Sequence, residues 1–176
     1  MIDNNFIIID GFIKERKNKV IENYQIIVSD SSIYLFNSSQ NYGKYLKSIF
    51  SGVTEILGLF GAFGLVGELA SEITGDKLSK MLKEYSKKSS KNNTKKLIKN
   101  LESISADKKG ITRIDYCNLT KVTIKRGFII NGSSSVEFSE KSNNLKLKTK
   151  DRNKINELTN AIGAFDNSIN IKTKFL

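Results

Sequence analysis

The sequence predicts an α+β protein: a bent antiparallel β-barrel of about seven strands, capped by a C-terminal helix, with a helical insertion between the third and fourth strands. Three observations carry this prediction. Two blocks of alternating apolar residues, 5–37 and 111–147, are typical of strands. The residues between them, 42–105, carry apolar side chains at helical spacing, and residues 151–165 near the C-terminus do the same. A chain of 176 residues is long enough for one domain with a single sizeable core.

The first block predicts three strands in an antiparallel meander. Asn5–Ile13 is rich in β-branched and aromatic residues, and a polar bend over residues 14–19 follows it. Val20–Ser29 predicts the second strand, and its Tyr, Ile and Val side chains alternate on one face. Asp30-Ser31-Ser32 is a tight-turn signal, after which Ile33–Phe36 returns as the third strand.

The insertion predicts three helices. The first is expected from Tyr42 to Thr74, with Gly75 as its C-terminal cap. Asp76 is the expected N-cap of the second helix, and Asn93 or Thr94 is that of the third. The apolar stripes of these two helices are Leu78, Met81, Leu82 and Tyr85 in the second and Leu97, Ile98, Leu101 and Ile104 in the third.

A glycine-rich apolar stretch lies inside the expected first helix. Its glycines recur every third residue and would leave a groove along one helix face where another backbone could approach closely. The uncharged part, Ile56–Gly67, is shorter than the roughly 20 residues that a membrane span needs. A buried or half-buried helix is therefore expected, with an interfacial membrane helix as the alternative. The expected helix-packing or oligomer face consists of Gly58, Gly61, Gly64, Gly67, Phe60 and Phe63.

We expect this helix to pack on the second helix as an antiparallel pair, because a short joint at Gly75-Asp76 favours antiparallel neighbours. Since the pair would be an insertion between strands, the strands are expected to fold without it. The expected contact joins Leu59, Phe63 and Val66 to Leu78, Met81, Leu82 and Tyr85.

The second block predicts four short strands and a helix. Ile111–Tyr116 and Leu119–Arg126 are the first two strands, and the other two are centred on residues 136–138 and 145–147. Asp151 is the expected N-cap of a helix whose apolar stripe suits the open end of a sheet. The last segment, 166–176, is either a frayed tail or an added edge strand. The stripe of the helix comprises Ile155, Leu158, Ile162 and Phe165.

Four runs resemble the bacterial and archaeal pleckstrin-homology-like domains of the GRAM-like kind. They are YQIIVSDSSIYLFN (24–37), IDYCNLTKVTIKRG (114–127), NLKLKTKD (144–151) and NKINELTNAI (153–162). Some members of such families carry a glycine-rich hydrophobic insertion between the two halves, which corresponds here to residues 42–105. The resemblance implies the following division: first half 1–41, insertion 42–106, second half with the C-terminal helix 107–165, and tail 166–176.

The resemblance also implies a binding module without chemistry of its own. Pleckstrin-homology-like domains that bind phosphoinositides typically place a lysine-rich pattern in the first hairpin loop. In this sequence Glu15 interrupts that loop, whose basic residues are Lys14, Arg16, Lys17 and Lys19.

Composition narrows the function further. The chain has 29 Lys and Arg against 18 Asp and Glu, a net charge of +11, which favours anionic partners. It has no histidine, so the commonest general base and the commonest metal ligand are missing. Its single cysteine, Cys117, excludes an internal disulfide framework and is expected as a small core hydrophobe. We therefore expect no catalytic residues, no cofactor and no metal site.

The expected function is a peripheral membrane or protein-interaction module that acts through a basic, glycine-lined helical arm. A homo-oligomer assembled through the glycine groove is the alternative. Nucleic-acid binding is disfavoured, because lysine dominates over arginine and no known recognition pattern occurs. The acidic N-terminus lacks the features of a signal peptide, so a cytoplasmic location, peripheral at the membrane, is expected. The candidates for an anionic surface are the four loop residues and Lys80, Lys83, Lys87, Lys88 and Lys91.

Overall fold

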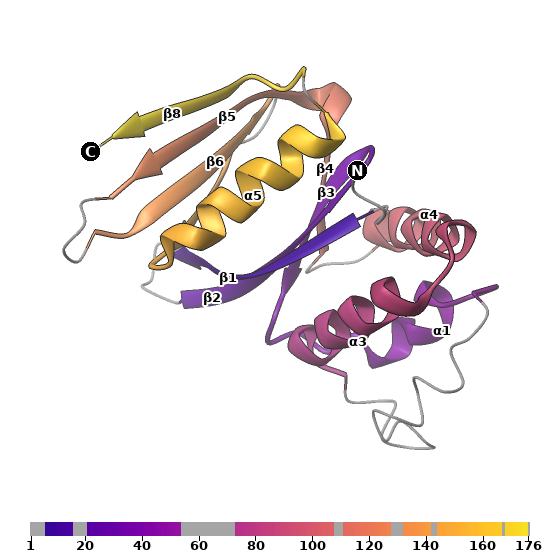
Figure 1. Cartoon of the computed structure of the whole chain (residues 1–176). Coiled ribbons are helices and arrows are strands. Elements are labelled where there is room, and N and C mark those ends of the chain that lie inside the picture. The colour runs from indigo at the N-terminus through magenta and orange to yellow at the C-terminus, as the bar shows by residue number, and fades with distance from the viewer. Residues whose placement is uncertain are drawn as a thin grey trace.

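The computed structural model is a mixed α+β structure built on one eight-stranded sheet (Figure 1). It describes residues 6–15, 21–53, 73–107, 111–127, 132–141, 144–166 and 168–175. The strand order is β4-β3-β2-β1-β7-β6-β5-β8, so β4 and β8 are the two edges of an open sheet and not neighbours in a closed barrel. The strands are β1 (Phe6–Glu15), β2 (Ile21–Ser29), β3 (Ser32–Asn37), β4 (Ile111–Asp115), β5 (Leu119–Arg126), β6 (Ser134–Glu140), β7 (Asn144–Thr149) and β8 (Ile171–Phe175).

Strands occur at all seven positions that the sequence predicts. β1 to β4 form one antiparallel meander and β5 to β7 a second. The eighth strand, β8, comes from the last segment and pairs with β5 in parallel, with Val122 opposite Ile171. Of the two alternatives for this segment, the structure therefore has the added edge strand.

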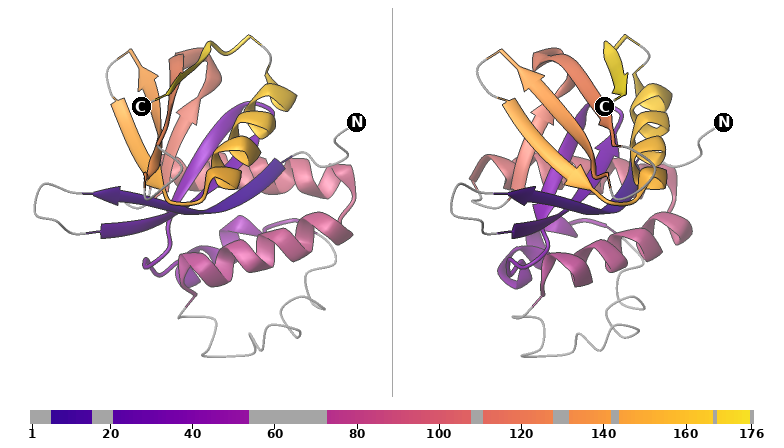
Figure 2. Two further views of the ribbon diagram at one scale, coloured as in Figure 1. Left: turned by 60° about the vertical axis from the view of Figure 1, so that its left-hand side comes forward. Right: turned by 90° about the vertical axis from the view of Figure 1, so that its left-hand side faces the viewer.

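The two meanders meet at a bend in β1. The register of β1 against β2 shifts between Ile9 and Phe12, and Gly11 lies in this bulge with a φ of 85°. The joint to β7 is narrow, because only Ile13 and Lys148 are paired there. The sheet consequently folds around helix α5 (Arg152–Phe165), which covers its inner face (Figure 2). Asp151 caps α5 as predicted, with its Oδ1 accepting a hydrogen bond from Asn153 N at 2.9 Å.

On the other face of the first meander, the described residues form three helices, which follow β3 and precede β4 in the chain. They are α1 (Leu46–Ile49), α3 (Gly75–Lys88) and α4 (Lys91–Asp107). Their apolar side chains share one core with Ile27, Tyr34 and Phe36 of the strands. The alternate residues of the same strands, such as Val28 and Leu35, enter a second core with α5. Strands covered on both faces read as continuous apolar runs, and every residue of β3 is buried.

The prediction of one long helix from Tyr42 to Thr74 is wrong for most of its described residues. The described part has a 3₁₀ turn, Gly43–Tyr45, and then the single helical turn α1. Gly52 follows with a φ of +65°, which a continuing α-helix cannot contain. Residues 54–72 lie outside the described residues, and with them the glycine-spaced face Gly58, Gly61, Gly64, Gly67, Phe60 and Phe63 and its expected contact with α3.

Two further details differ from the sequence prediction. Gly75 begins α3 and does not end an earlier helix, and Thr74, not Asp76, is the N-cap, with its Oγ1 3.4 Å from Lys77 N. α4 begins at Lys91, slightly before the predicted start. Cys117 is exposed in the short 3₁₀ turn Tyr116–Asn118, so its expected place in the core is wrong.

The position of Gly75 explains why no other residue fits there. A Cβ on Gly75 would lie 2.6 Å from the carbonyl oxygen of Asn37 and 2.8 Å from the Cα of Ser38. Both atoms belong to backbone that cannot move away easily, because Asn37 is the last residue of β3. The glycine therefore allows the start of α3 to approach the end of the strand.

We predict that Gly75→Ala lowers the free energy of unfolding by more than about 1 kcal/mol, because the new methyl group overlaps backbone. The matched control is Gly163→Ala in α5, where a Cβ would meet no atom within 4 Å. That change should raise stability by up to about 1 kcal/mol through helix propensity. Urea denaturation of both variants measures the difference, and equal effects of the two substitutions would contradict the assigned contact.

The shared core also bears on whether the strands fold alone. We predict that replacing residues 42–106 by a Gly/Ser linker abolishes cooperative unfolding, because it uncovers Ile27, Tyr34 and Phe36 together. This is the opposite of the expectation from the sequence. The single change Leu82→Ala should destabilise the whole chain by about 2–5 kcal/mol. Circular dichroism with thermal melting tests both, and a β-rich deletion variant with a sharp transition would show that the strands are independent.

Candidate functional site: a basic helical face and an adjoining pocket

The exposed side of α3 and α4 is covered by lysine. We call this surface the basic helical face; its members, all exposed, are Lys77, Lys80, Lys87, Lys88, Lys91, Lys95, Lys96 and Lys99. It arises because every apolar side chain of the stripes in α3 and α4 is buried against the sheet. In the described part of the chain, Ile21 alone is an exposed large hydrophobic residue, and it lies in β2. The basic helical face therefore offers charge and almost no apolar surface.

The structure brings together only some of the predicted anionic-surface residues. Lys80, Lys87, Lys88 and Lys91 belong to the basic helical face. Lys14 is half-buried in β1, far along the chain from them, while Arg16, Lys17 and Lys19 lie outside the described residues. Four members of the face were not among the residues that the sequence predicted for an anionic surface: Lys77, Lys95, Lys96 and Lys99.

Lys83, another of the predicted residues, forms an ion pair within the fold. Its Nζ lies 2.9 Å from Asp10 Oδ2, and Lys154 Nζ of α5 lies 3.1 Å from the other oxygen of the same carboxylate. The hydrogen bond from Lys83 is the main reason why the pKa of Asp10 is below its ordinary value. Lys83 therefore ties α3 through β1 to α5, and its ammonium is occupied within the fold.

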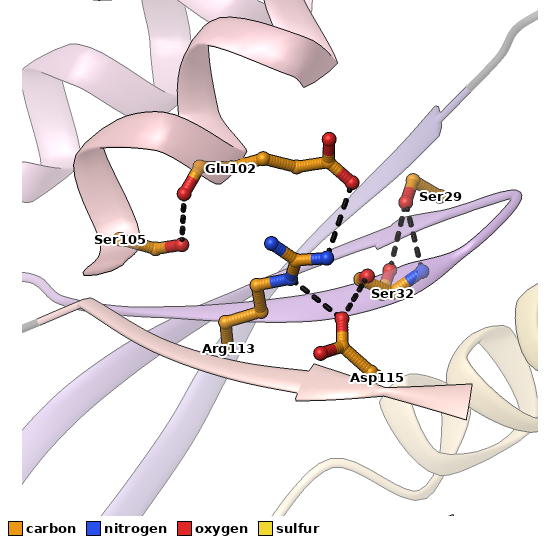
Figure 3. A network of polar contacts seen from close by, with 6 residues as sticks. All are labelled: Ser29, Ser32, Glu102, Ser105, Arg113 and Asp115. Carbon is orange, nitrogen blue, oxygen red and sulfur yellow. Dashed lines mark hydrogen bonds and ion pairs between the residues drawn. The ribbon is translucent and has the colours of Figure 1, made fainter. Parts of the chain in front are cut away.

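A polar network joins α4 to the edge of the sheet (Figure 3). Arg113 of β4 donates from Nε to Asp115 Oδ1 at 2.6 Å, and its Nη2 lies 3.3 Å from Glu102 Oε1 of α4. Ser32 of β3 donates to the same Asp115 oxygen at 2.7 Å, although the two residues are 83 positions apart. One guanidinium thus holds two carboxylates, one from a helix and one from a strand.

The network continues into the turn between β2 and β3. Ser29 Oγ donates to the carbonyl oxygen of Ser32 at 2.8 Å and accepts from its backbone N–H at 3.2 Å. Tyr116 holds the turn from the other side: its hydroxyl donates to Ser29 O at 2.8 Å, and its N–H donates to Ser31 O at 3.2 Å. Burial raises the pKa of Tyr116 well above its ordinary value, so the hydroxyl keeps its proton. Asp30 and Ser31 are therefore presented in a fixed position.

A surface pocket of about 240 Å³ lies between this turn and α4. Asp30 and Ser31 line one wall, and Lys95, Ile98, Lys99 and Glu102 of α4 line the other. The sequence identified Asp30 and Ser31 only as a turn. Nothing in the pattern signalled that a turn at residue 30 and a helix at residue 100 would face each other, because β4 brings them together.

The polar side chains of the described residues determine what the site can bind. No group of three or more Asp, Glu or Cys side chains among them could hold a metal ion. None of the helices within the described ranges has the length and apolar character needed to cross a membrane. Charged and hydrogen-bonding side chains around a rigid turn can bind and orient a polar group, and this is the chemistry the arrangement supports.

Comparison with known proteins adds no assignment: no family model, no curated protein and no solved structure matches this chain.

The network yields a prediction about stability. Arg113→Met removes the cation between Glu102 and Asp115 but keeps an unbranched side chain in its place. We expect the free energy of unfolding to fall by about 1–2 kcal/mol. A fully buried network would lose more, but these side chains are about one-third exposed. The control is Lys87→Met, since Lys87 pairs with Glu84 in a much more exposed place and should show no measurable change. Equal effects in chemical denaturation would mean that the network does not hold α4 to β4.

Proposed function

We propose that this chain is a non-enzymatic binding module of the pleckstrin-homology-like kind that docks on anionic membrane surfaces through the basic helical face. The single observation that carries the proposal is the separation of side chains on α3 and α4, with lysines outward and apolar residues inward. The fold assignment is supported by the order of elements: a four-strand and a three-strand antiparallel meander, followed by α5 in the concave side of the sheet.

The glycine-rich run supports a membrane over other anionic partners. Val53 and Ile73 are the described residues on either side of this run, and both are buried in the core that α3 and α4 share with the strands. Ile73 is also held by Tyr42, whose N–H donates to its carbonyl oxygen at 2.6 Å. The segment that contains the uncharged run Ile56–Gly67 is therefore anchored at both ends in the core beneath the lysines of α3 and α4. Basic surface beside apolar sequence is the combination that membrane interfaces favour.

The described surface argues against single-stranded nucleic acid as the partner. Proteins that bind it combine positive charge with exposed aromatic rings on which bases stack. No aromatic side chain is among the exposed large hydrophobic residues of the described ranges. The glycine-mediated homo-oligomer stays a prediction, because its residues lie outside the described part of the chain.

The proposal predicts strong, salt-sensitive binding to acidic vesicles. Each lysine near an anionic surface contributes on the order of 1 kcal/mol at low salt. The triple variant Lys77→Gln, Lys80→Gln, Lys88→Gln should therefore bind about 100-fold more weakly to vesicles with phosphatidylglycerol. The measurement is co-sedimentation in low salt, and binding should fall again in 0.5 M salt because the charges are screened.

The matched control removes the same charge from the other half of the chain. Lys146, Lys172 and Lys174 are exposed on β7 and β8, and their triple Gln variant should bind nearly as well as the original protein. Thermal melting of both triple variants checks that the fold is retained. If the two triple variants lose affinity equally, only net charge matters and the basic helical face is not the docking surface.

A further inference from the structure

We propose that the pocket between the β2–β3 turn and α4 binds the phosphoethanolamine group, a phosphodiester joined by two carbons to an ammonium. This inference deepens the proposed function and rests on it for one point, namely that the group is supplied by a membrane lipid. The charges, the size and the fixed turn of the pocket favour this group.

The α4 wall suits the phosphate. Lys95 and Lys99 are one helical turn apart, both exposed, and neither forms an ion pair with a carboxylate in the described ranges. Like charges at this spacing disfavour the helix slightly, and an anion held between them removes that repulsion. The two ammonium groups can donate to different oxygens of one phosphate.

The turn wall suits an ammonium. Asp30 presents an exposed carboxylate there, opposite Lys95 and Lys99, whereas the half-buried carboxylate of Glu102 lies on the α4 wall itself, three residues after Lys99. Glu102 shares its only described cation, Arg113, with Asp115. Negative charge therefore remains near the pocket, and it would repel a ligand that carries only negative charge.

The charges of the pocket and its supporting network balance. Lys95, Lys99 and Arg113 are three cations, and Asp30, Glu102 and Asp115 are three anions. A ligand that carries separated opposite charges and no net charge matches this arrangement better than inorganic phosphate does. A phosphoethanolamine diester has one negative and one positive charge.

The size of the pocket agrees with this group. The pocket opens to solvent, and its volume of about 240 Å³ has room for a group of this size. Ile98 lies between the two lysines on α4 and can contact the two-carbon linker. Ser31 adds a hydroxyl group that can donate to the phosphate or accept from the ammonium.

The backbone of the turn and the side chain of Glu102 are held in place before any ligand arrives. Ser29 and Tyr116 fix the turn that carries Asp30, and Arg113 fixes Glu102. Preorganised polar groups lose little entropy on binding, so a small head group can gain measurable affinity from few contacts. Selectivity follows from hydrogen bonding: a primary ammonium donates three hydrogen bonds to carboxylates, whereas a quaternary trimethylammonium donates none.

The first test uses soluble head groups and the full chain. Titration with glycerophosphoethanolamine, followed by NMR or calorimetry, should show at least tenfold tighter binding than glycerophosphocholine or inorganic phosphate. Asp30→Asn should remove the preference for ethanolamine over choline, and Lys95→Gln with Lys99→Gln should weaken both ligands. Lys146→Gln is the control, because Lys146 is exposed on β7, outside both the pocket and the basic helical face. Equal binding of the three probes, or a preference that survives Asp30→Asn, would overturn the inference.

The second test separates this inference from the proposed function. Vesicles of phosphatidylglycerol and phosphatidylcholine are compared with vesicles in which phosphatidylethanolamine replaces the phosphatidylcholine. The exchange should tighten binding at least threefold for the original chain and not for Asp30→Asn. Binding to both vesicles without this gain rejects the pocket ligand and leaves the docking surface standing. Binding of glycerophosphoethanolamine without vesicle binding supports the pocket and rejects the membrane as its source.

Discussion

The rest of the structure depends on the burial of strands β2 and β3 from both sides. Alternate residues of these strands feed two separate cores, one with α5 and one with α1, α3 and α4. A pair of strands covered on one face only would leave Tyr34, Phe36 and Ile27 in water, each with roughly 1.5–3 kcal/mol of burial energy unrealised. Helices α1, α3 and α4 are therefore part of the core, and the lysines of α3 and α4 lie on the outward faces of these helices.

The same two-sided burial explains why the pocket is where it is. A strand pair buried on both faces must keep its connecting turn in a fixed place, and Ser29, Tyr116 and Arg113 satisfy the polar groups at that end. These contacts stabilise the edge of the sheet and also hold Asp30 opposite the lysines of α4, with Glu102 beside those lysines on the same helix. Stability and a binding geometry come from one set of hydrogen bonds.

Local patterns predicted the strands and α5 well, because alternation and the Asp151 cap are properties of neighbouring residues. They failed where distant segments meet. Gly75 looks like a helix end in the sequence, but its lack of a side chain is required by the carbonyl of Asn37. Cys117 follows a strand and looks buried, but the 3₁₀ turn exposes it. The pocket had no local signal, since its two walls meet only through the pairing of β3 with β4.

The pairing of β3 with β4 also has a kinetic consequence. The bond between Ser32 and Asp115 closes a chain segment of 83 positions, and β4 has no other strand neighbour in the described sheet. The entropy of closing so long a segment must be lost before its contacts are gained, which slows folding of sheets with non-local pairing. Helices α3 and α4 form locally and shorten the distance that remains to be closed. Nascent chains should therefore stay incomplete at this edge until Arg113 has been synthesised and has reached Glu102.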